Sequence, residues 1–240
     1  MIKVENIDVY NFEGAIRGMR NPLNSWDKSD SHWCEDLPCG YIPDERPKCQ
    51  GFGGYCIGNK DLSLMQKLVK GGPDHSKFMR QIFVSMDITG PLYWWKEFDT
   101  YKVGTVANSC STMHKIHEKE FTLEDFSHEH LLKADNCKDE EIINVSGIPY
   151  TSRGFFLHII NALNFFRTLY LNTKDKKYWW QMIQFLPSSY NQKRTVTLNY
   201  QILRNMYFSR KNHKLDEWRE FCNIIEELPC AKKLICYKGE

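Results

Sequence analysis

Hydrophobic residues recur with helical or strand spacing in several segments, and they predict a protein that contains both structures. Residues 81–88 alternate between apolar and polar side chains, which predicts a strand. The most regular helical segment is 152–173, whose wide apolar face predicts a buried helix of a hairpin or bundle. That face contains Phe155, Phe156, Ile159, Ile160, Leu163, Phe166 and Leu169. We therefore expect an α+β protein with a central antiparallel sheet and a helix-rich C-terminal half.

Shorter segments predict further helices. Thr122 and Asp125 resemble a capping box, with Asp in the Glu/Gln position, so a helix is expected over 122–133. Asp61 is expected at or near the N-cap of a helix that stops at Gly71. The helices predicted by this reasoning cover 61–70, 92–101, 122–133, 178–185, 198–210 and 215–228.

One segment of the chain, residues 21–58, shows neither the helical nor the strand spacing of apolar residues. Residues 21–58 are rich in Pro, Gly and Cys, and we interpret them as a Cys-rich loop insertion within a single domain spanning 1–240. The cysteines of this insertion are Cys34, Cys39, Cys49 and Cys56. A zinc site usually has two closely spaced cysteine pairs, and only the first pair here comes close to that spacing. Free thiols are therefore favoured, a zinc site stays the alternative, and no metal ligand is assigned.

Composition excludes several classes of protein. At 42% hydrophobic residues, the chain has enough apolar surface to build a core, so it is not disordered as a whole. A net charge of +2 argues against a general nucleic-acid binder. No stretch approaches the roughly 18 apolar residues of a membrane span. Because the N-terminal sequence lacks a basic-then-apolar signal pattern, we expect a cytoplasmic protein.

Polar side chains interrupt the apolar pattern of the helix predicted over 198–210. They include Asn199, Gln201, Asn205 and Arg210. At about 100° per residue, Asn199 and Arg210 share one helical face, and Gln201 and Asn205 share another. For this segment alone, a partly solvated helix explains the pattern.

The wider pattern around this helix resembles the C-terminal signature of the flavin-dependent thymidylate synthases. The matching residues are Leu186-Pro187, Asn199, Asn205, Arg210, His213, Glu217 and Arg219, with no gap between Pro187 and Arg210. Upstream, Asp74-His75 resembles the family's Gly-His, and Ala15-Ile16-Arg17 is similar to its Ala-Ala-Arg. The resemblance covers roughly 10–20 and 60–230, and the Cys-rich insertion lies outside it.

The nucleotide-binding half departs from the family pattern. Lys96-Glu97 replaces the family's Arg-Gln, Tyr101-Lys102 overlies the His-Arg of its flavin motif, and Ile183 replaces an arginine. Without gaps, Cys110 overlies a serine of that motif. A shift of two or three residues would instead align Thr112 and His114 with the end of the motif, and both registers stay open.

The resemblance implies a homotetrameric flavoprotein that binds FAD. It implies one-carbon transfer from methylenetetrahydrofolate to C5 of dUMP or a related pyrimidine deoxynucleotide, with NADPH as the reductant. Arg210 then polarises the pyrimidine and is the catalytic residue. The implied flavin-binding residues are His75, Lys102, Asn199, Gln201 and Asn205, and the implied substrate-binding residues are Lys96, Glu97, Cys110 and Arg210.

Two other classes of function stay open. One is a non-catalytic homologue that keeps nucleotide or flavin binding, because arginines of the family pattern are replaced. The other is an interaction protein held together by a metal in the Cys-rich insertion. For Cys110, a buried structural thiol is favoured over a nucleophile, although a neighbouring Lys102 or His114 would lower a thiol pKa.

Overall fold

The structure is a computed structural model, and it describes residues 1–33 and 55–238. The chain divides into two compact units, each built from separate segments of the sequence. The first unit comprises Met1–Lys3, Thr89–Glu97 and Asn108–Arg194, and the second comprises Val4–Ile88, Phe98–Ala107 and Thr195–Glu240. That residues 1–240 form a single domain stays a prediction.

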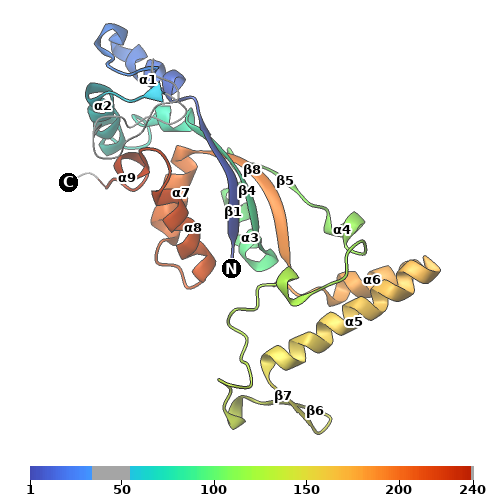
Figure 1. The fold of residues 1–240 in the computed structure, drawn as a ribbon. Coiled ribbons are helices and arrows are strands. Elements are labelled where there is room, and N and C mark those ends of the chain that lie inside the picture. The colour runs from blue at the N-terminus through green and yellow to red at the C-terminus, as the bar shows by residue number, and fades with distance from the viewer. Residues whose placement is uncertain (34–54, 239–240) are drawn as a thin grey trace. The chain divides into compact units, whose positions relative to one another are not determined.

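A four-stranded antiparallel sheet is the central element (Figure 1). Its strands, in spatial order, are β1 (Lys3–Tyr10), β4 (Phe83–Pro91), β8 (Asn191–Asn199) and β5 (Val106–Ser109). The predicted strand over 81–88 corresponds to β4, and its alternating residues Val84, Met86 and Ile88 are buried. The predicted α+β class with a central antiparallel sheet is therefore confirmed.

The first unit contains a helical hairpin. Its helices are α5 (Ser152–Thr173), whose predicted bounds are confirmed, and α6 (Lys176–Phe185), which lies beside α5 (Figure 1). The Thr151 hydroxyl accepts a hydrogen bond from the Gly154 amide and caps α5. The unit also contains α4 (Thr112–Lys115) and the hairpin of β6 (Ile143–Val145) and β7 (Ile148–Tyr150).

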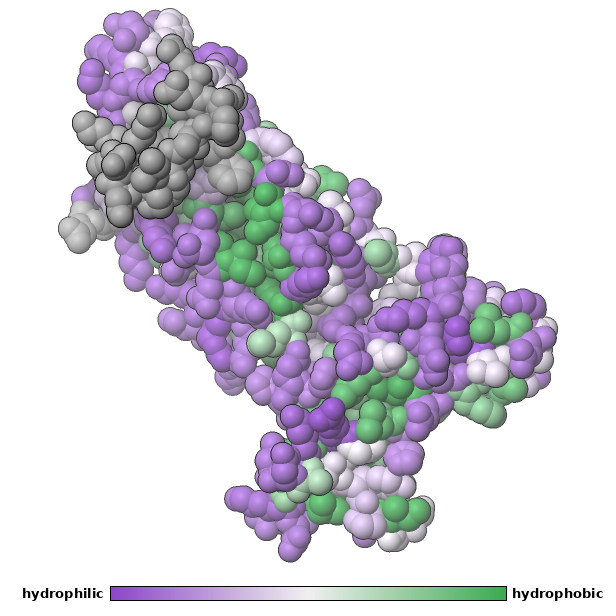
Figure 2. Space-filling model, viewed as in Figure 1, coloured by the Kyte–Doolittle hydropathy of each residue, from purple (hydrophilic) through white to green (hydrophobic). Residues whose placement is uncertain are grey.

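The apolar face of α5 is buried only in part. Phe156, Ile160 and Leu163 lie in a core cluster with Phe126 and Met182. Other apolar side chains of the hairpin are exposed, namely Leu157, Phe165, Trp180 and Phe185. Figure 2 shows hydrophobic surface over this hairpin. Of the predicted face, Phe156, Ile160 and Leu163 are buried and the other four residues are half-buried, whereas the exposed side chains lie outside that face.

The helix predicted over 122–133 is wrong. The capping box of Thr122 and Asp125 is present, but it closes only the single 3-10 turn Leu123–Asp125. The backbone of Phe126 is extended, and Phe126 pairs with Tyr190 in an isolated bridge. The Phe126 ring is buried in the core cluster. This burial is reached with an extended backbone, so the chain leaves the helical conformation directly after the turn.

The second unit contains the remaining long helices. They are α1 (Phe12–Arg20), α2 (Asn59–Lys70), α7 (Tyr200–Arg210) and α8 (Asp216–Glu226), followed by the short α9 (Ala231–Leu234).

The helix α3 (Leu92–Phe98) follows β4 and confirms the helix expected there. Leu198 and Asn199, predicted as helical, belong to β8. Within the described residues, we find no helix with the length and apolar character to cross a membrane.

The described ends of the Cys-rich insertion pair with each other. The short strands β2 (His32–Trp33) and β3 (Tyr55–Cys56) are antiparallel. Cys56 forms no disulfide bond within the described residues, and Cys34, Cys39 and Cys49 lie outside them. The N-cap of α2 is Gly58, and Asp61 lies near it, in the first turn of the helix. The Asp61 side chain does not cap the helix: it is fully buried and accepts a hydrogen bond from Arg20 at 2.7 Å.

Candidate functional site

The helix α7 begins directly where β8 ends, and Asn199 makes this junction. The Asn199 side-chain oxygen accepts a hydrogen bond from the Ile202 amide at 3.1 Å, so Asn199 is the N-cap. The residue is only 8% exposed. Its side-chain NH2 has no hydrogen-bond partner within the part of the chain that the structure describes, so it can donate to a ligand.

The segment after α3 lies against the start of α7. Gly104 has a φ of +80°, and a Cβ atom there would lie 3.0 Å from the Ile202 Cδ1 atom and 3.6 Å from the Asn199 Nδ2 atom. Only glycine adopts this backbone freely and leaves that space open. Lys102, two residues earlier, is exposed. The predicted flavin-binding residues Lys102 and Asn199 therefore come from two segments in close contact.

Arg210, at the end of α7, is held by aromatic residues. Its Nε donates to the Tyr101 hydroxyl at 3.0 Å. The guanidinium carbon lies 5.0 Å from the ring centroid of Trp218 and 5.6 Å from that of Tyr101. These contacts place a permanent positive charge in a half-buried setting, where its field is weakened less than in water. The segment 101–104 thus contacts both ends of α7.

The other predicted amides lie on a separate face of α7. The Gln201 NH2 group donates to the Asn205 side-chain oxygen at 3.1 Å, which confirms that these residues share a face. The hydroxyl of Ser76 donates to the Gln201 oxygen at 3.2 Å. Ser76 is buried and follows the exposed His75, so the structure links the His75 segment to Gln201 and Asn205. The sequence reasoning did not identify Ser76.

A cavity of about 500 Å³ includes His75 in its wall. Its apolar side chains are Met19, Leu23, Leu64, Leu68 and Phe78, and its polar ones include Asp74, His75, Lys77 and Gln81. A Cβ atom at Gly18 would lie 2.5 Å from the Gln81 side-chain oxygen, so glycine keeps this wall open. A largely apolar cavity with a few polar groups at its edge is typical of cofactor sites.

Contacts with the C-terminal segment fix α7 in place. Arg204 donates to the carbonyl oxygens of Leu234 at 3.0 Å and Ile235 at 2.8 Å, and burial lowers the pKa of its guanidinium. The Tyr200 hydroxyl donates to the Pro229 carbonyl at 2.6 Å, and burial raises the pKa of this tyrosine. The helix that carries Gln201, Asn205 and Arg210 is therefore anchored by side chains that take no part in the predicted site.

Three predicted substrate-binding residues, Lys96, Glu97 and Cys110, belong to the first unit. Lys96 is exposed and Glu97 is half-buried. Cys110 is exposed, so the expectation of a buried structural thiol is wrong. The Cys110 backbone is anchored at both ends, because its amide donates to Lys193 and its carbonyl accepts from Gln192, each at 2.9 Å.

Two polar residues of β8, Gln192 and Arg194, were not predicted from the sequence as part of a site. Gln192 is 8% exposed, and its oxygen accepts a hydrogen bond from the Arg194 Nε at 3.0 Å. The Arg194 guanidinium carbon lies 4.2 Å from the ring centroid of Trp95. Both positions share the two-residue period of the buried Val196 and Leu198. Polar residues at inward positions of a strand are the signal that could have identified them.

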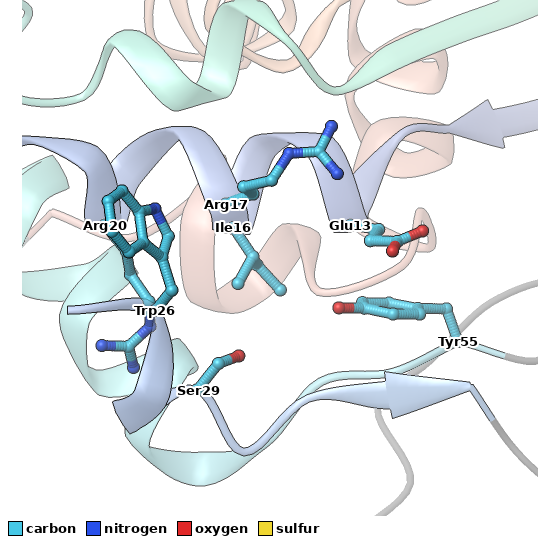
Figure 3. A pocket seen from close by; sticks show the side chains of 7 residues that line it. All are labelled: Glu13, Ile16, Arg17, Arg20, Trp26, Ser29 and Tyr55. Atoms are coloured by element: carbon cyan, nitrogen blue, oxygen red, sulfur yellow. The ribbon is translucent and has the colours of Figure 1, made fainter. Parts of the chain in front are cut away.

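A smaller cavity of about 220 Å³ lies between α1 and the ends of the Cys-rich insertion (Figure 3). The side chains of Glu13, Arg17 and Tyr55 contribute to its wall, with the Tyr55 hydroxyl directed into it. Burial, together with the charges of Glu13 and Asp61 and partly opposed by Arg17, raises the pKa of Tyr55 to about 12. This cavity contains none of the predicted site residues.

Comparison with solved structures identifies the fold. Thymidylate synthase X (ThyX) of Helicobacter pylori, solved with FAD and dUMP, superposes with a TM-score of 0.63 at 17% identity, covering 100% of both chains. Another structure of this flavin-dependent enzyme with FAD and dUMP gives 0.59 at 16% identity, covering 96% of this chain and 97% of that one. No family model and no curated protein sequence matches the chain. The chain therefore has the fold of the flavin-dependent thymidylate synthases.

Proposed function

We propose that this protein is an FAD-dependent, thymidylate synthase-like enzyme and a cytoplasmic homotetramer. It transfers one carbon from methylenetetrahydrofolate to C5 of a pyrimidine deoxynucleotide, dUMP or a relative, with NADPH as the reductant. The observation that carries this proposal is the placement of Arg210. Its guanidinium is held by Tyr101 and Trp218 at the end of α7, in a fold whose Helicobacter pylori examples contain FAD and dUMP.

The residues of the second unit fit a flavin dinucleotide. Asn199 has an unused amide donor, and Gly104 leaves open the space beside it. Gln201 and Asn205 offer neutral hydrogen bonds for a cofactor ring. In the cavity that includes His75, Lys77 supplies a positive charge suited to a phosphate, and the apolar wall suits an adenine ring. When bound, the reduced flavin supplies the hydride.

The proposed role of Arg210 follows from its chemistry. Electron density that develops along the N3–O4 edge of the pyrimidine is stabilised by a fixed positive charge in a site with little water. An arginine keeps its charge at every physiological pH, and its planar fork matches two acceptors side by side. The Arg210 Nε donates to the Tyr101 hydroxyl. Tyr101 thereby orients the guanidinium.

One observation favours a second candidate, a non-catalytic homologue that binds flavin or nucleotide. Ile183 stands where the family pattern has an arginine, and it packs against the apolar core cluster of the first unit. An apolar side chain that packs against the core therefore stands where the family pattern has a positive charge. Together with Glu97 in place of a glutamine, this exchange removes hydrogen-bond donors that would serve a nucleotide.

Absorbance and turnover of the purified protein distinguish these candidates. The proposal expects flavin absorbance bands at about one FAD per chain, and dTMP formation from dUMP, methylenetetrahydrofolate and NADPH. Bound flavin, with neither dTMP formed from dUMP nor 5-methyl-dCMP formed from dCMP, would favour the non-catalytic homologue. A colourless protein that contains one zinc per chain would contradict the proposal and favour the metal-held interaction protein.

A further inference from the structure

A third cavity, of about 450 Å³, lies in the first unit at the end of the α5–α6 hairpin beside α4. Its volume lies in the range of small-molecule sites. Two lysines and two histidines contribute to its wall, Lys174, Lys176, His114 and His117, together with the aromatic rings of Tyr170 and Trp179. None of the residues assigned above to the flavin or to the pyrimidine belongs to this cavity.

The charge of this cavity is uncompensated. No acidic side chain belongs to its wall, and neither Lys174 nor Lys176 makes an ion pair within the described residues. The neighbouring Asp175 is paired with Lys177 at 3.1 Å instead. Two lysines that face one cavity without a counter-ion create a positive potential that attracts an anion.

The aromatic wall is rigid. The Trp179 Nε1 donates to the Met113 carbonyl at 3.1 Å, which joins α6 to α4. The ring of His117 meets that of Tyr170 edge to face, at 4.9 Å between centroids. Lys174 lies at the C-cap of α5, where a φ of 57° returns its Nζ to 5.9 Å from the Tyr170 ring centroid. Each ring is therefore held before any ligand arrives.

The charges and the rings suit one kind of ligand. The two lysines attract an anion, and the two rigid aromatic rings offer faces for a flat ring. The cavity is therefore complementary to a ligand that carries both an anion and a flat ring.

We propose that this cavity binds a mononucleotide, with its phosphate at Lys174 and Lys176 and its base against Trp179 and Tyr170. Because the Trp179 Nε1 is already used by Met113, the wall has few groups that read the edge of a base. Stacking accepts every base, since each has an aromatic face. The site therefore takes purine and pyrimidine nucleotides alike. It does not depend on flavin or on the proposed one-carbon transfer.

Calorimetric titration of the full-length protein with AMP tests this site, because a purine is not the proposed substrate. We expect saturable binding, and weakening by about tenfold or more in Lys174→Ala/Lys176→Ala. Lys177→Ala is the matched control, since Lys177 is adjacent but paired with Asp175. It leaves the affinity for AMP unchanged. Flavin content and dTMP formation stay at the wild-type level in all three proteins, which separates this site from the proposed enzymatic one.

The contribution of the ring is tested separately. Trp179→Ala weakens AMP binding by at least about fivefold, whereas Trp179→Phe retains most of it, because phenylalanine keeps a stacking face. UMP binds within a few-fold of AMP. Binding of inorganic phosphate as tight as that of AMP would overturn the nucleotide assignment. The site itself is overturned if AMP gives no binding, or if the lysine double variant binds AMP as well as the wild type does.

Discussion

At the scale of single residues, the buried pair of Arg20 and Asp61 has the clearest energetic consequence. Asp61 is 0% exposed and accepts hydrogen bonds from Arg20 at 2.7 Å, Ser29 at 2.6 Å and the Ser31 hydroxyl at 2.7 Å. Arg20 also donates to the carbonyls of Ser25 and Lys28. The start of the Cys-rich insertion is therefore held against α1 and α2 by one satisfied network.

We predict that Asp61→Asn destabilises the fold by about 3 kcal/mol, because it leaves the Arg20 charge buried without its counter-charge. Urea unfolding followed by circular dichroism measures this effect. Asp175→Asn is the control: it breaks the exposed pair with Lys177 and should leave the unfolding midpoint nearly unchanged. Equal shifts of the midpoint in the two variants would contradict a special role for the buried pair.

The same carboxylate predicts a pH dependence. Burial alone would raise the pKa of Asp61, but the hydrogen bonds from Ser29, Ser31 and Arg20 outweigh it, so the pKa lies below its usual value. The unfolded chain, with an Asp pKa of about 3.9, then binds this proton more readily than the folded chain. The stabilisation is complete above about pH 5 and is lost as the pH falls through the lower folded pKa.

Urea midpoints measured between pH 3 and 7 check this prediction. The difference between the wild type and Asp61→Asn should be constant at neutral pH and should shrink in acid. A difference that grows on acidification would mean that the pKa of Asp61 is raised rather than lowered. The network could not be predicted from the sequence, because Arg20 and Asp61 are 41 positions apart and neither belongs to a motif.

At the scale of elements, α7 shows what sequence periodicity can and cannot establish. The grouping of Gln201 with Asn205 follows from helical geometry and is confirmed by their hydrogen bond. The contact of Arg210 with Tyr101 joins residues 109 positions apart, and no local pattern indicates it. Asn199 was assigned to the helix interior, whereas it ends β8 and caps α7, because the strand before it was not recognised.

The cap position of Asn199 leads to a prediction that separates stability from cofactor binding. Asn199→Asp keeps the oxygen that accepts from Ile202 but loses the amide donor, so the fold should stay stable while FAD binds several-fold more weakly. Asn199→Ala loses both groups and should also cost about 1 kcal/mol of stability. Thermal unfolding and flavin titration measure the two effects. Full FAD affinity in Asn199→Asp would remove this residue from the flavin site.

Element boundaries were predictable where capping and burial agree. For α5, the Thr151 cap and the long apolar period indicate the same bounds, and these are the observed ones. At Thr122 the capping box is real, but the next apolar residue, Phe126, reaches the core from an extended backbone. A cap determines where a helix can begin, whereas the packing of the following residues determines whether it continues.

At the scale of the whole molecule, the exposed side of the α5–α6 hairpin bears on self-association. Phe165 is 59% exposed and Phe185 is 51% exposed on this hairpin. Large exposed apolar side chains gathered on one element are typical of a surface that another chain covers. This feature supports the proposal of a homotetramer.

We predict that the wild type is tetrameric by light scattering after size-exclusion chromatography, and that Phe165→Asp shifts it to smaller species. A carboxylate in an apolar interface costs several kcal/mol, which is enough to dissociate a typical contact at micromolar concentration. Ile148→Asp, at an exposed apolar position in β7, serves as the control. A wild-type monomer, or a tetramer in which Phe165→Asp has no effect, would contradict this interface.

The central claim is that Arg210 activates a pyrimidine in a flavin-loaded enzyme, and one comparison tests it most directly. Wild type and Arg210→Ala, each loaded with FAD, are given dUMP, methylenetetrahydrofolate and NADPH, and dTMP is quantified. We expect dTMP from the wild type and none above background from Arg210→Ala, with the flavin absorbance retained in both. Equal dTMP formation by the two proteins would contradict it.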